Sequence, residues 1–178
     1  MSAGVDTSRR FFLRGAVLTR EGREEAIRRQ RPLGPRPPWL DGRIDPAYCA
    51  ACDPACVSAC EQHIIRIHPS DHLQAGLPWL DFTAGGCTFC ADCARACPRV
   101  ERIVDTPQIG TAQIDTGRCL AWNDVICLSC AGVCRERALR RDRSRRVTVD
   151  TLSCTGCGQC ISKCPVMALT IIWKTGSE

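Results

Sequence analysis

Short aliphatic stretches recur along the chain at a fixed place relative to polar, cysteine-rich stretches. Each follows the last cysteine of such a stretch by four to six residues, and they are Ile64–Ile65, Ile103, Ala138–Leu139 and Ala168–Leu169. The pattern predicts a strand, a cysteine-rich loop, a short helix and a return strand, repeated four times. The loops must be irregular, because neither a helix nor a strand brings residues two or three apart to one point. We therefore expect a loop-rich α+β fold.

The segment before the first cysteine has a different pattern. Residues 8–31 resemble an amphipathic helix that Gly15 and Gly22 interrupt, and four prolines between residues 32 and 38 prevent helix beyond it. We expect a basic helical arm over residues 1–31 and a stiff, proline-rich linker over residues 32–43. The richest apolar run, residues 165–173, is nine residues long and too short to span a membrane.

Sixteen of the 178 residues are cysteine, whereas aromatic residues make up only 5%. Because so few side chains can build an apolar core, we expect metal or disulfides to help hold the fold. The cysteines form four groups whose first members lie 32 to 38 residues apart. The groups are Cys49, Cys52, Cys56 and Cys60; Cys87, Cys90, Cys93 and Cys97; Cys119, Cys127, Cys130 and Cys134; and Cys154, Cys157, Cys160 and Cys164.

Three chemistries use cysteines in such numbers. Disulfides between cysteines two or three residues apart would be strained, and no secretory apolar segment accompanies them. Zinc ribbons use two well-separated C-x2-C pairs, which is one ligand fewer per loop than this chain offers. Groups two and four instead match C-x2-C-x2-C-x3-C-P, the bacterial ferredoxin run. We interpret all sixteen cysteines as iron ligands of 4Fe–4S clusters, in two ferredoxin-like modules in tandem, residues 44–105 and 106–178.

Groups one and three depart from the ferredoxin spacing. Group one has an extra residue between Cys52 and Cys56 and has Glu61 where a proline is expected. Group three has seven residues between Cys119 and Cys127. We expect the clusters of these two groups to be more labile, and three to four clusters in the isolated protein.

The pairing of the groups is open. Adjacent pairing joins group one to two and three to four, and nested pairing joins two to three and one to four. Asp115 and Asp150, each four residues before a first cysteine, mark groups three and four as neighbours and favour adjacent pairing. Because the fourth cysteine of a run ligates the other cluster, adjacent pairing predicts two crosswise sets in the first module. They are Cys49, Cys52, Cys56 and Cys97, and Cys60, Cys87, Cys90 and Cys93.

The positive charge is uneven. Residues 1–43 contain ten arginines and five acidic residues, and the rest of the chain is balanced before any thiolate is counted. Seven further arginines lie in residues 135–146 without interleaved aromatic residues, so we expect a solvated hairpin facing an acidic partner and no nucleic-acid site. The three histidines, His63, His68 and His72, are expected in surface loops.

The four cysteine groups, together with Ser8-Arg9-Arg10 and Arg36-Pro37-Pro38-Trp39, resemble the NapF family of ferredoxin-type proteins. The spacing of group three is also similar to that family, and the resemblance extends over essentially the whole chain. The family accompanies bacterial periplasmic nitrate reductases. The resemblance implies a cytoplasmic iron–sulfur protein that binds the precursor of the catalytic subunit, NapA, before its export. It would assist maturation by handling electrons or iron–sulfur assembly.

Alternatives remain for the arm and for the function. Residues 8–14 follow the twin-arginine export pattern, but only Gly15–Leu18 stand where a longer apolar stretch is needed, so we expect retention in the cytoplasm. The arm either docks to a partner or its leader, or is simply a solvated helix. Two functions are the alternatives to a role in maturation: relay of electrons from a quinol-oxidising module to a reductase, and donation of clusters to another protein. No phosphate-loop, hydrolase or zinc-protease motif is present, so we expect no stand-alone enzyme.

Overall fold

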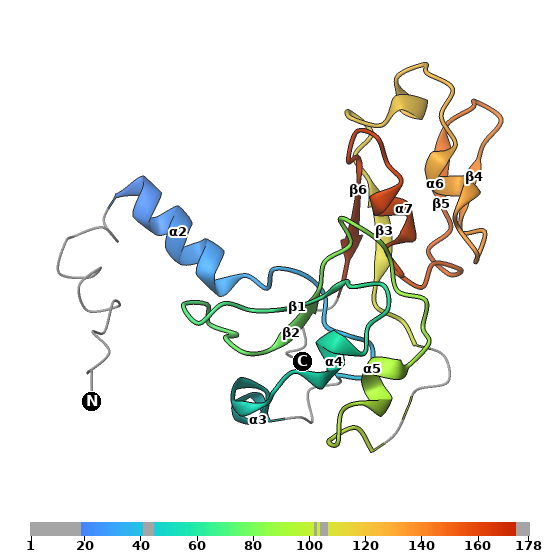
Figure 1. Ribbon diagram of the computed structural model, residues 1–178. Coiled ribbons are helices and arrows are strands. Elements are labelled where there is room, and N and C mark those ends of the chain that lie inside the picture. Colours follow the sequence, from blue (N-terminus) through green and yellow to red (C-terminus); the bar gives the residue numbers. More distant parts are fainter. Residues whose placement is uncertain (1–18, 41–44, 102, 104–106, 174–178) are drawn as a thin grey trace.

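The computed structural model describes residues 19–40, 45–101, 103 and 107–173. After helix α2 (Arg20–Gln30), short helices and strands follow one another in two modules that stack end to end (Figure 1). The first contains α3 (Pro46–Ala51), α4 (Ala55–Ser58), β1 (Ile65–Ile67), β2 (Pro78–Leu80) and α5 (Asp92–Arg95). The second contains β3 (Thr111–Ile114), the 3-10 helix η2 (Leu120–Trp122), α6 (Ser129–Gly132), β4 (Leu139–Arg141), β5 (Val147–Val149), α7 (Gln159–Ser162) and β6 (Leu169–Ile172).

The strands form three antiparallel pairs. β1 pairs with β2, β3 with β6 and β4 with β5, and Ile65 lies opposite Leu80, Ile114 opposite Leu169 and Leu139 opposite Val149. Three of the four aliphatic stretches therefore lie at or beside return strands, as the sequence pattern predicts. This arrangement confirms a loop-rich fold of small helices and strands.

Two parts of the predicted repeat are wrong. Ile103 belongs to no strand, and its side chain is 40% exposed, so group two has no return strand at this residue. Cys49, the first cysteine of group one, lies in helix α3, where the repeat predicts an irregular loop. Asp45 caps this helix by accepting the Ala47 N–H at 2.9 Å, and Pro46 occupies its first turn, where a missing N–H costs no hydrogen bond.

Helix α2 runs through Gly22 without the interruption predicted there. Gly22 lies in the first turn, and the Arg23 N–H bonds to the Thr19 carbonyl at 3.1 Å, so the glycine lowers helix propensity without ending the helix. The helix contains four arginines and three glutamates and is close to charge balance. The rest of the predicted basic arm, including Gly15, lies in residues 1–18, outside the described residues.

Residues 32–40 contain no helix, as their prolines predict, but they are packed against the first module and do not form a free linker. The Leu80 N–H donates to the Pro35 carbonyl at 2.8 Å, which adds this segment to the edge of β2. Pro37 is among the most deeply buried side chains, and Trp39 and Leu40 are also buried. Burial of these apolar side chains offsets the scarcity of core residues elsewhere.

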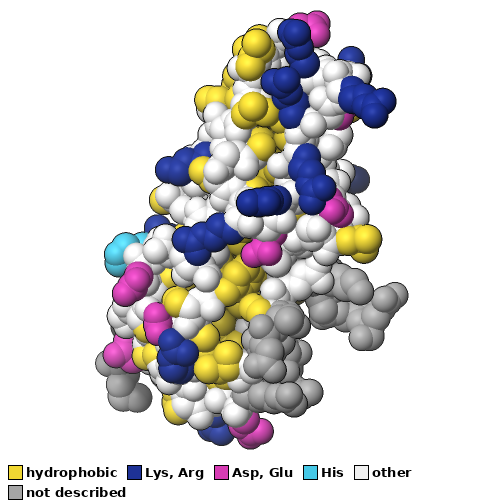
Figure 2. Space-filling view, turned by 90° about the vertical axis from the view of Figure 1, so that its right-hand side faces the viewer, with side chains coloured by type: hydrophobic (Ala, Val, Ile, Leu, Met, Phe, Trp, Pro, Cys, Tyr) yellow, Lys and Arg dark blue, Asp and Glu magenta, His cyan; other side chains and the backbone are white. Residues whose placement is uncertain are grey.

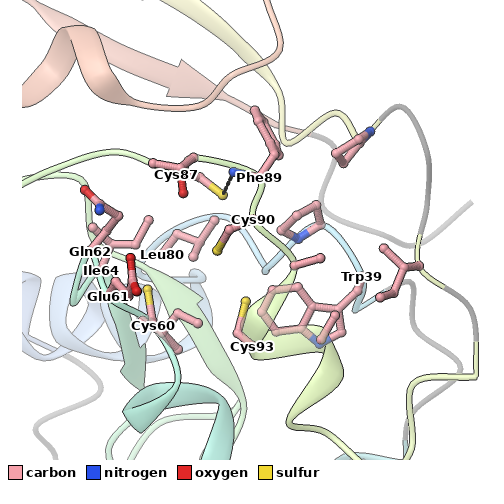
Figure 3. Close-up of a pocket in the computed structure, with 17 residues that line it drawn as sticks. Trp39, Cys60, Glu61, Gln62, Ile64, Leu80, Cys87, Phe89, Cys90 and Cys93 are labelled. Carbon is pink, nitrogen blue, oxygen red and sulfur yellow. Dashed lines mark hydrogen bonds between the residues drawn. The ribbon is translucent and has the colours of Figure 1, made fainter.

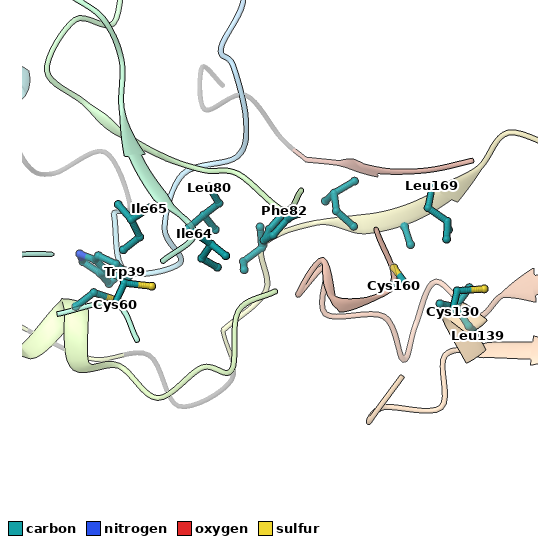
Figure 4. Close-up of a cluster of buried hydrophobic side chains, with 14 of the residues drawn as sticks. Trp39, Cys60, Ile64, Ile65, Leu80, Phe82, Cys130, Leu139, Cys160 and Leu169 are labelled. Carbon is teal, nitrogen blue, oxygen red and sulfur yellow. The ribbon is translucent and has the colours of Figure 1, made fainter. Parts of the chain in front are cut away.

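One buried core runs through both modules (Figure 4). Trp39, Ile64 and Leu80 lie in the first module, Leu139 and Leu169 lie in the second, and Phe82 is drawn between the two sets. Cysteines belong to this core, which explains how so few aromatic residues suffice. In the part of the chain that the structure describes, no helix combines the length and the apolar character needed to cross a membrane.

Candidate iron–sulfur sites

Each cysteine group presents its third and fourth cysteines in the same way. The third cysteine lies in a four-residue helix, and the fourth follows the C-cap residue of that helix; the helices are α4, α5, α6 and α7. The N–H of each fourth cysteine bonds to the carbonyl of the residue after the third, at 3.0–3.3 Å. The third and fourth cysteines of one group therefore lie one helical turn apart.

Backbone N–H groups are aimed at the sulfurs. The Ala138 N–H donates to Cys134 Sγ at 3.3 Å and the Ala168 N–H to Cys164 Sγ at 3.2 Å, so groups three and four repeat one contact. The Phe89 N–H donates to Cys87 Sγ at 3.4 Å. Such bonds stabilise thiolate over thiol and are one means by which a protein sets the reduction potential of a cluster.

Aspartate turns deliver the first cysteines of groups three and four. Asp115 accepts the Gly117 N–H at 3.0 Å, Asp150 accepts the Leu152 N–H at 3.1 Å, and the carbonyl of each bonds to the N–H of the following cysteine. The pKa of Asp150 is held low by hydrogen bonds, first from the Ser153 hydroxyl. Asp81 forms the same kind of turn with Thr83 before group two. The internal repeat does not reveal this aspartate, because Asp81 stands six residues before Cys87, whereas Asp115 and Asp150 stand four residues before their cysteines.

The sixteen cysteines come together as four sets of four, each with three cysteines of one group and the fourth cysteine of its neighbour. Three sets line cavities. In the remaining set, after burial, Cys134 and Cys154 raise the pKa of Cys157, and Cys157 and Cys154 raise that of Cys160. Set A is Cys49, Cys52, Cys56 and Cys97; set B is Cys60, Cys87, Cys90 and Cys93; set C is Cys134, Cys154, Cys157 and Cys160; set D is Cys119, Cys127, Cys130 and Cys164. The groups are therefore paired with their neighbours along the chain, in both modules.

Set B surrounds a cavity of about 140 Å³ (Figure 3). This is well above the roughly 10–15 Å³ that a cavity needs, on this kind of measure, to hold one water. Apart from the cysteines, its walls are apolar except for Glu61, Gln62 and Thr88, with Ile64, Leu80 and Phe89 among the lining side chains. Trp39 lines this cavity and also that of set A, so a residue predicted to lie in a linker separates two cysteine sets.

The thiols of a set oppose one another's ionisation. Burial raises the pKa of Cys93 to about 12, and Cys60, Cys87 and Cys90 add to the rise. Burial likewise raises the pKa of Cys56 to about 11, followed by Cys97 from the neighbouring group. Burial and then Cys157 raise the pKa of Cys160 to about 12. Four thiolates in one buried site thus require a positively charged partner, which an iron–sulfur core provides.

The residues present fit 4Fe–4S clusters. All sixteen cysteines are free thiols, and among the described residues no three side chains converge on a single metal ion. A 4Fe–4S cluster needs no such convergence, since each of its four cysteines binds a different iron atom. The buried Thr155 hydroxyl finds no partner among the described oxygen and nitrogen atoms, and it lies beside the Cys157 sulfur. Individual ligand assignments stay predictions.

The long spacer of group three is held by two side chains that sequence reasoning did not single out. The Asn123 amide donates to the carbonyls of Thr116, Gly117 and Cys119 at 2.8–3.3 Å. The Trp122 indole N–H donates to the Val147 carbonyl at 2.9 Å, and the Arg146 guanidinium lies 4.9 Å from its ring centroid. These contacts hold the segment between Cys119 and Cys127 in a defined turn that packs against β5.

The expected exposure is found for the arginines of residues 135–146 but not for two of the three histidines. The arginines of residues 135–146 are exposed on the β4–β5 hairpin, as predicted, and basic side chains gather at the level of the second module in Figure 2. Of the histidines, only His63 is exposed. His68 and His72 are 2% and 7% exposed, because the β1–β2 connection folds back under residues 31–33.

Comparison with known proteins agrees with this arrangement. Residues 48–100 match a family model described as a 4Fe-4S dicluster domain, and residues 147–170 match one described as a 4Fe-4S binding domain. The first match covers groups one and two together, in agreement with two clusters in the first module. The chain therefore holds multiple 4Fe–4S clusters.

Several curated proteins are similar over much of their length. Ferredoxin-type protein NapF of Escherichia coli K12 is 32% identical over 172 residues, which cover 93% of this chain and 94% of NapF. Ferredoxin-type protein NapG of the same organism is 29% identical and covers 92% of this chain and 84% of NapG. Methylamine utilization ferredoxin-type protein MauM of Paracoccus denitrificans is 32% identical over 66% of this chain and 60% of MauM.

Proposed function

Because the chain belongs to the NapF family of ferredoxin-type proteins, we propose that it assists maturation of the periplasmic nitrate reductase subunit NapA in the cytoplasm. It would bind the NapA precursor before export and handle electrons, or assist iron–sulfur assembly, with clusters held by sets A to D. The observation that carries this proposal is the similarity to NapF over 93% of the chain.

Helix α2 supports a docking role for the arm. Wherever the structure describes the side chains of this helix they are exposed, and Ile27, an apolar residue, is 54% exposed. The helix points away from both modules (Figure 1). An isolated helix of eleven residues gains little stability from its own hydrogen bonds, so contact with a partner would order it further.

Two buried histidines fasten the arm to the first module at the end of α2. His72 Nδ1 accepts the Gln74 N–H at 3.0 Å, so its Nε2 carries the proton and donates to the Arg31 carbonyl at 2.9 Å. His68 Nε2 accepts the Leu33 N–H at 3.3 Å. Both imidazoles are neutral in this arrangement, and we call the pair the histidine clasp. It gives the arm a fixed origin while leaving α2 in solvent.

The experiment is anaerobic affinity purification from cells grown on nitrate, with mass spectrometry of the proteins that co-purify from soluble and membrane fractions. The full chain is compared with a variant that lacks residues 1–30 and so keeps the clasp. We expect the full chain to recover leader-bearing NapA from the soluble fraction, and the truncated chain to lose it at unchanged iron content. Arg66→Ala, which removes an exposed arginine on β1 away from both the arm and the β4–β5 hairpin, is the charge control and should retain the precursor.

Two results would overturn the proposal. Equal recovery of the precursor by the truncated chain would remove the role of the arm. Recovery of the mature reductase or of a membrane quinol-oxidising module, with no precursor, would favour electron relay over maturation.

A further inference from the structure

The two modules meet where Gly86 and Cys87 contact Cys157 and Gln159, and where Phe82 contacts Gly158. We propose that this contact, which we call the junction, is where an electron passes between the modules, from set B to set C, and that Gly86 positions it. The inference rests on the electron handling in the proposed function and on no particular partner. With clusters bound in the two sets, one electron would pass from a reduced cluster to an oxidised one, with no bond broken and no proton moved.

The junction joins the peptide groups of two cysteines from different sets. The Cys87 N–H donates to the Cys157 carbonyl at 2.7 Å, and the Gln159 side chain donates to the Gly86 carbonyl at 3.3 Å. A hydrogen-bonded peptide bridge therefore connects sets B and C directly.

Packing holds the junction closed. The Phe82 ring, from the strand end before group two, lies against Gly158, where a Cβ atom would fall 2.2 Å from the ring. Gly158 has φ +79°, a left-handed conformation that glycine adopts at little cost. Phe82 belongs to the core that continues into the second module, as Figure 4 shows. The contact is thus a packed part of the fold and not a chance approach of two loops.

Within each module, the short helices bring the two sets together. Cys56 of set A and Cys60 of set B flank the end of α4, and Cys160 of set C and Cys164 of set D flank the end of α7. With the junction joining B to C, the sets follow the order A, B, C, D. An electron that enters at one module therefore has a continuous sequence of neighbouring sites to the other.

Gly86 is the residue that permits this approach. A Cβ at position 86 would lie 2.4 Å from the Gln159 nitrogen and 2.7 Å from the Cys157 carbonyl oxygen, both backbone atoms. Backbone atoms cannot rotate away as a side-chain end can, so Gly86→Ala must push the modules apart. Gly85 provides the matched control, because the nearest atom to its added Cβ lies at 3.6 Å, an ordinary contact.

The test is electron paramagnetic resonance of the full chain, loaded with iron and sulfide and reduced anaerobically with dithionite. Neighbouring reduced clusters broaden and split one another's signals and speed one another's spin relaxation. We expect the wild type and Gly85→Ala to share one coupled spectrum. Gly86→Ala, at equal iron content, should lose the part of the coupling that joins the modules and keep the coupling within each module.

Phe82→Ala is a second variant in case Gly86→Ala fails to load iron. It removes the ring that holds Gly158 without adding atoms, and it should weaken the same part of the coupling. An unchanged spectrum in every variant that carries full iron would overturn the junction. Because no partner is present, this result is independent of precursor capture: either proposal can fail while the other holds.

Discussion

The residues on either side of the second cysteine of groups two and four adopt left-handed backbone conformations. In group four they are glycines, Gly156 and Gly158, with φ of +70° and +79°. In group two they are Phe89 and Ala91, with φ of +57° and +62°. A residue with a Cβ pays about 1–2 kcal/mol for this conformation, so the loop of group two is strained where that of group four is not.

Replacement of Ala91 by glycine should therefore stabilise the first module. Relief of the strain outweighs the added freedom of glycine in the unfolded chain, about 0.4–1 kcal/mol, and we expect a gain of about 0.5–1 kcal/mol. The measurement is the guanidinium midpoint of unfolding under anaerobic conditions. Ala94→Gly, the same change at a buried position inside α5, is the control and should lower the midpoint. A midpoint that stays or falls in Ala91→Gly would contradict the strain argument.

At the scale of the element, the sequence predicts the cysteine-rich turns correctly, but it does not predict how the β1–β2 connection is buried. Each turn is fixed locally by ligand spacing, a one-turn helix and a capping aspartate, which recur in the sequence. The connection is fixed by residues far away in the chain: His68 and His72 bond to the backbone at residues 31–33, and their rings lie 4.5 Å apart. The spacing of histidines in a sequence does not reveal a distant backbone partner. The expectation that His68 and His72 lie in surface loops is therefore wrong.

The histidine clasp should make the attachment of the arm depend on pH. Burial, followed by the nearby His72 and Arg36, lowers the pKa of His68 below its usual value of about 6.5, although the Leu77 carbonyl opposes the shift. The unfolded or released state therefore binds the proton more readily than the clasped state. The stabilisation is complete above pH of about 6.5 and is lost as the pH falls below it toward the lowered pKa.

Hydrogen exchange of backbone amides measures this directly. The Leu33 amide, bonded to His68, should lose protection between pH 7.5 and 5.5 after correction for the intrinsic exchange rate. The Leu80 amide is the control, because it bonds to the Pro35 carbonyl in the same segment without a titrating partner. Constant Leu33 protection over this range, or equal losses at both amides, would show that the clasp is not the pH-sensitive element.

At the scale of the whole molecule, the sequence predicted the cofactor and the four groups but left their pairing open. Spacing within a group reflects one loop, whereas pairing depends on which helices pack together, and α4 packs with α5 and α6 with α7. The packing of residues 32–40 against the first module was not predicted either, because prolines exclude a helix but do not indicate which surface the segment contacts. Trp39 between sets A and B is the clearest case of a residue whose place only the fold reveals.

The central claim is that four clusters are held by four crosswise cysteine sets, and a double variant tests it most directly. Cys52 and Cys97 come from different groups but share set A. Native mass spectrometry of the anaerobically purified wild type should count four clusters. Cys52→Ala with Cys97→Ala should lose one cluster and leave three intact. Damage to two clusters in the double variant, or fewer than four in the fully loaded wild type, would contradict the crosswise arrangement.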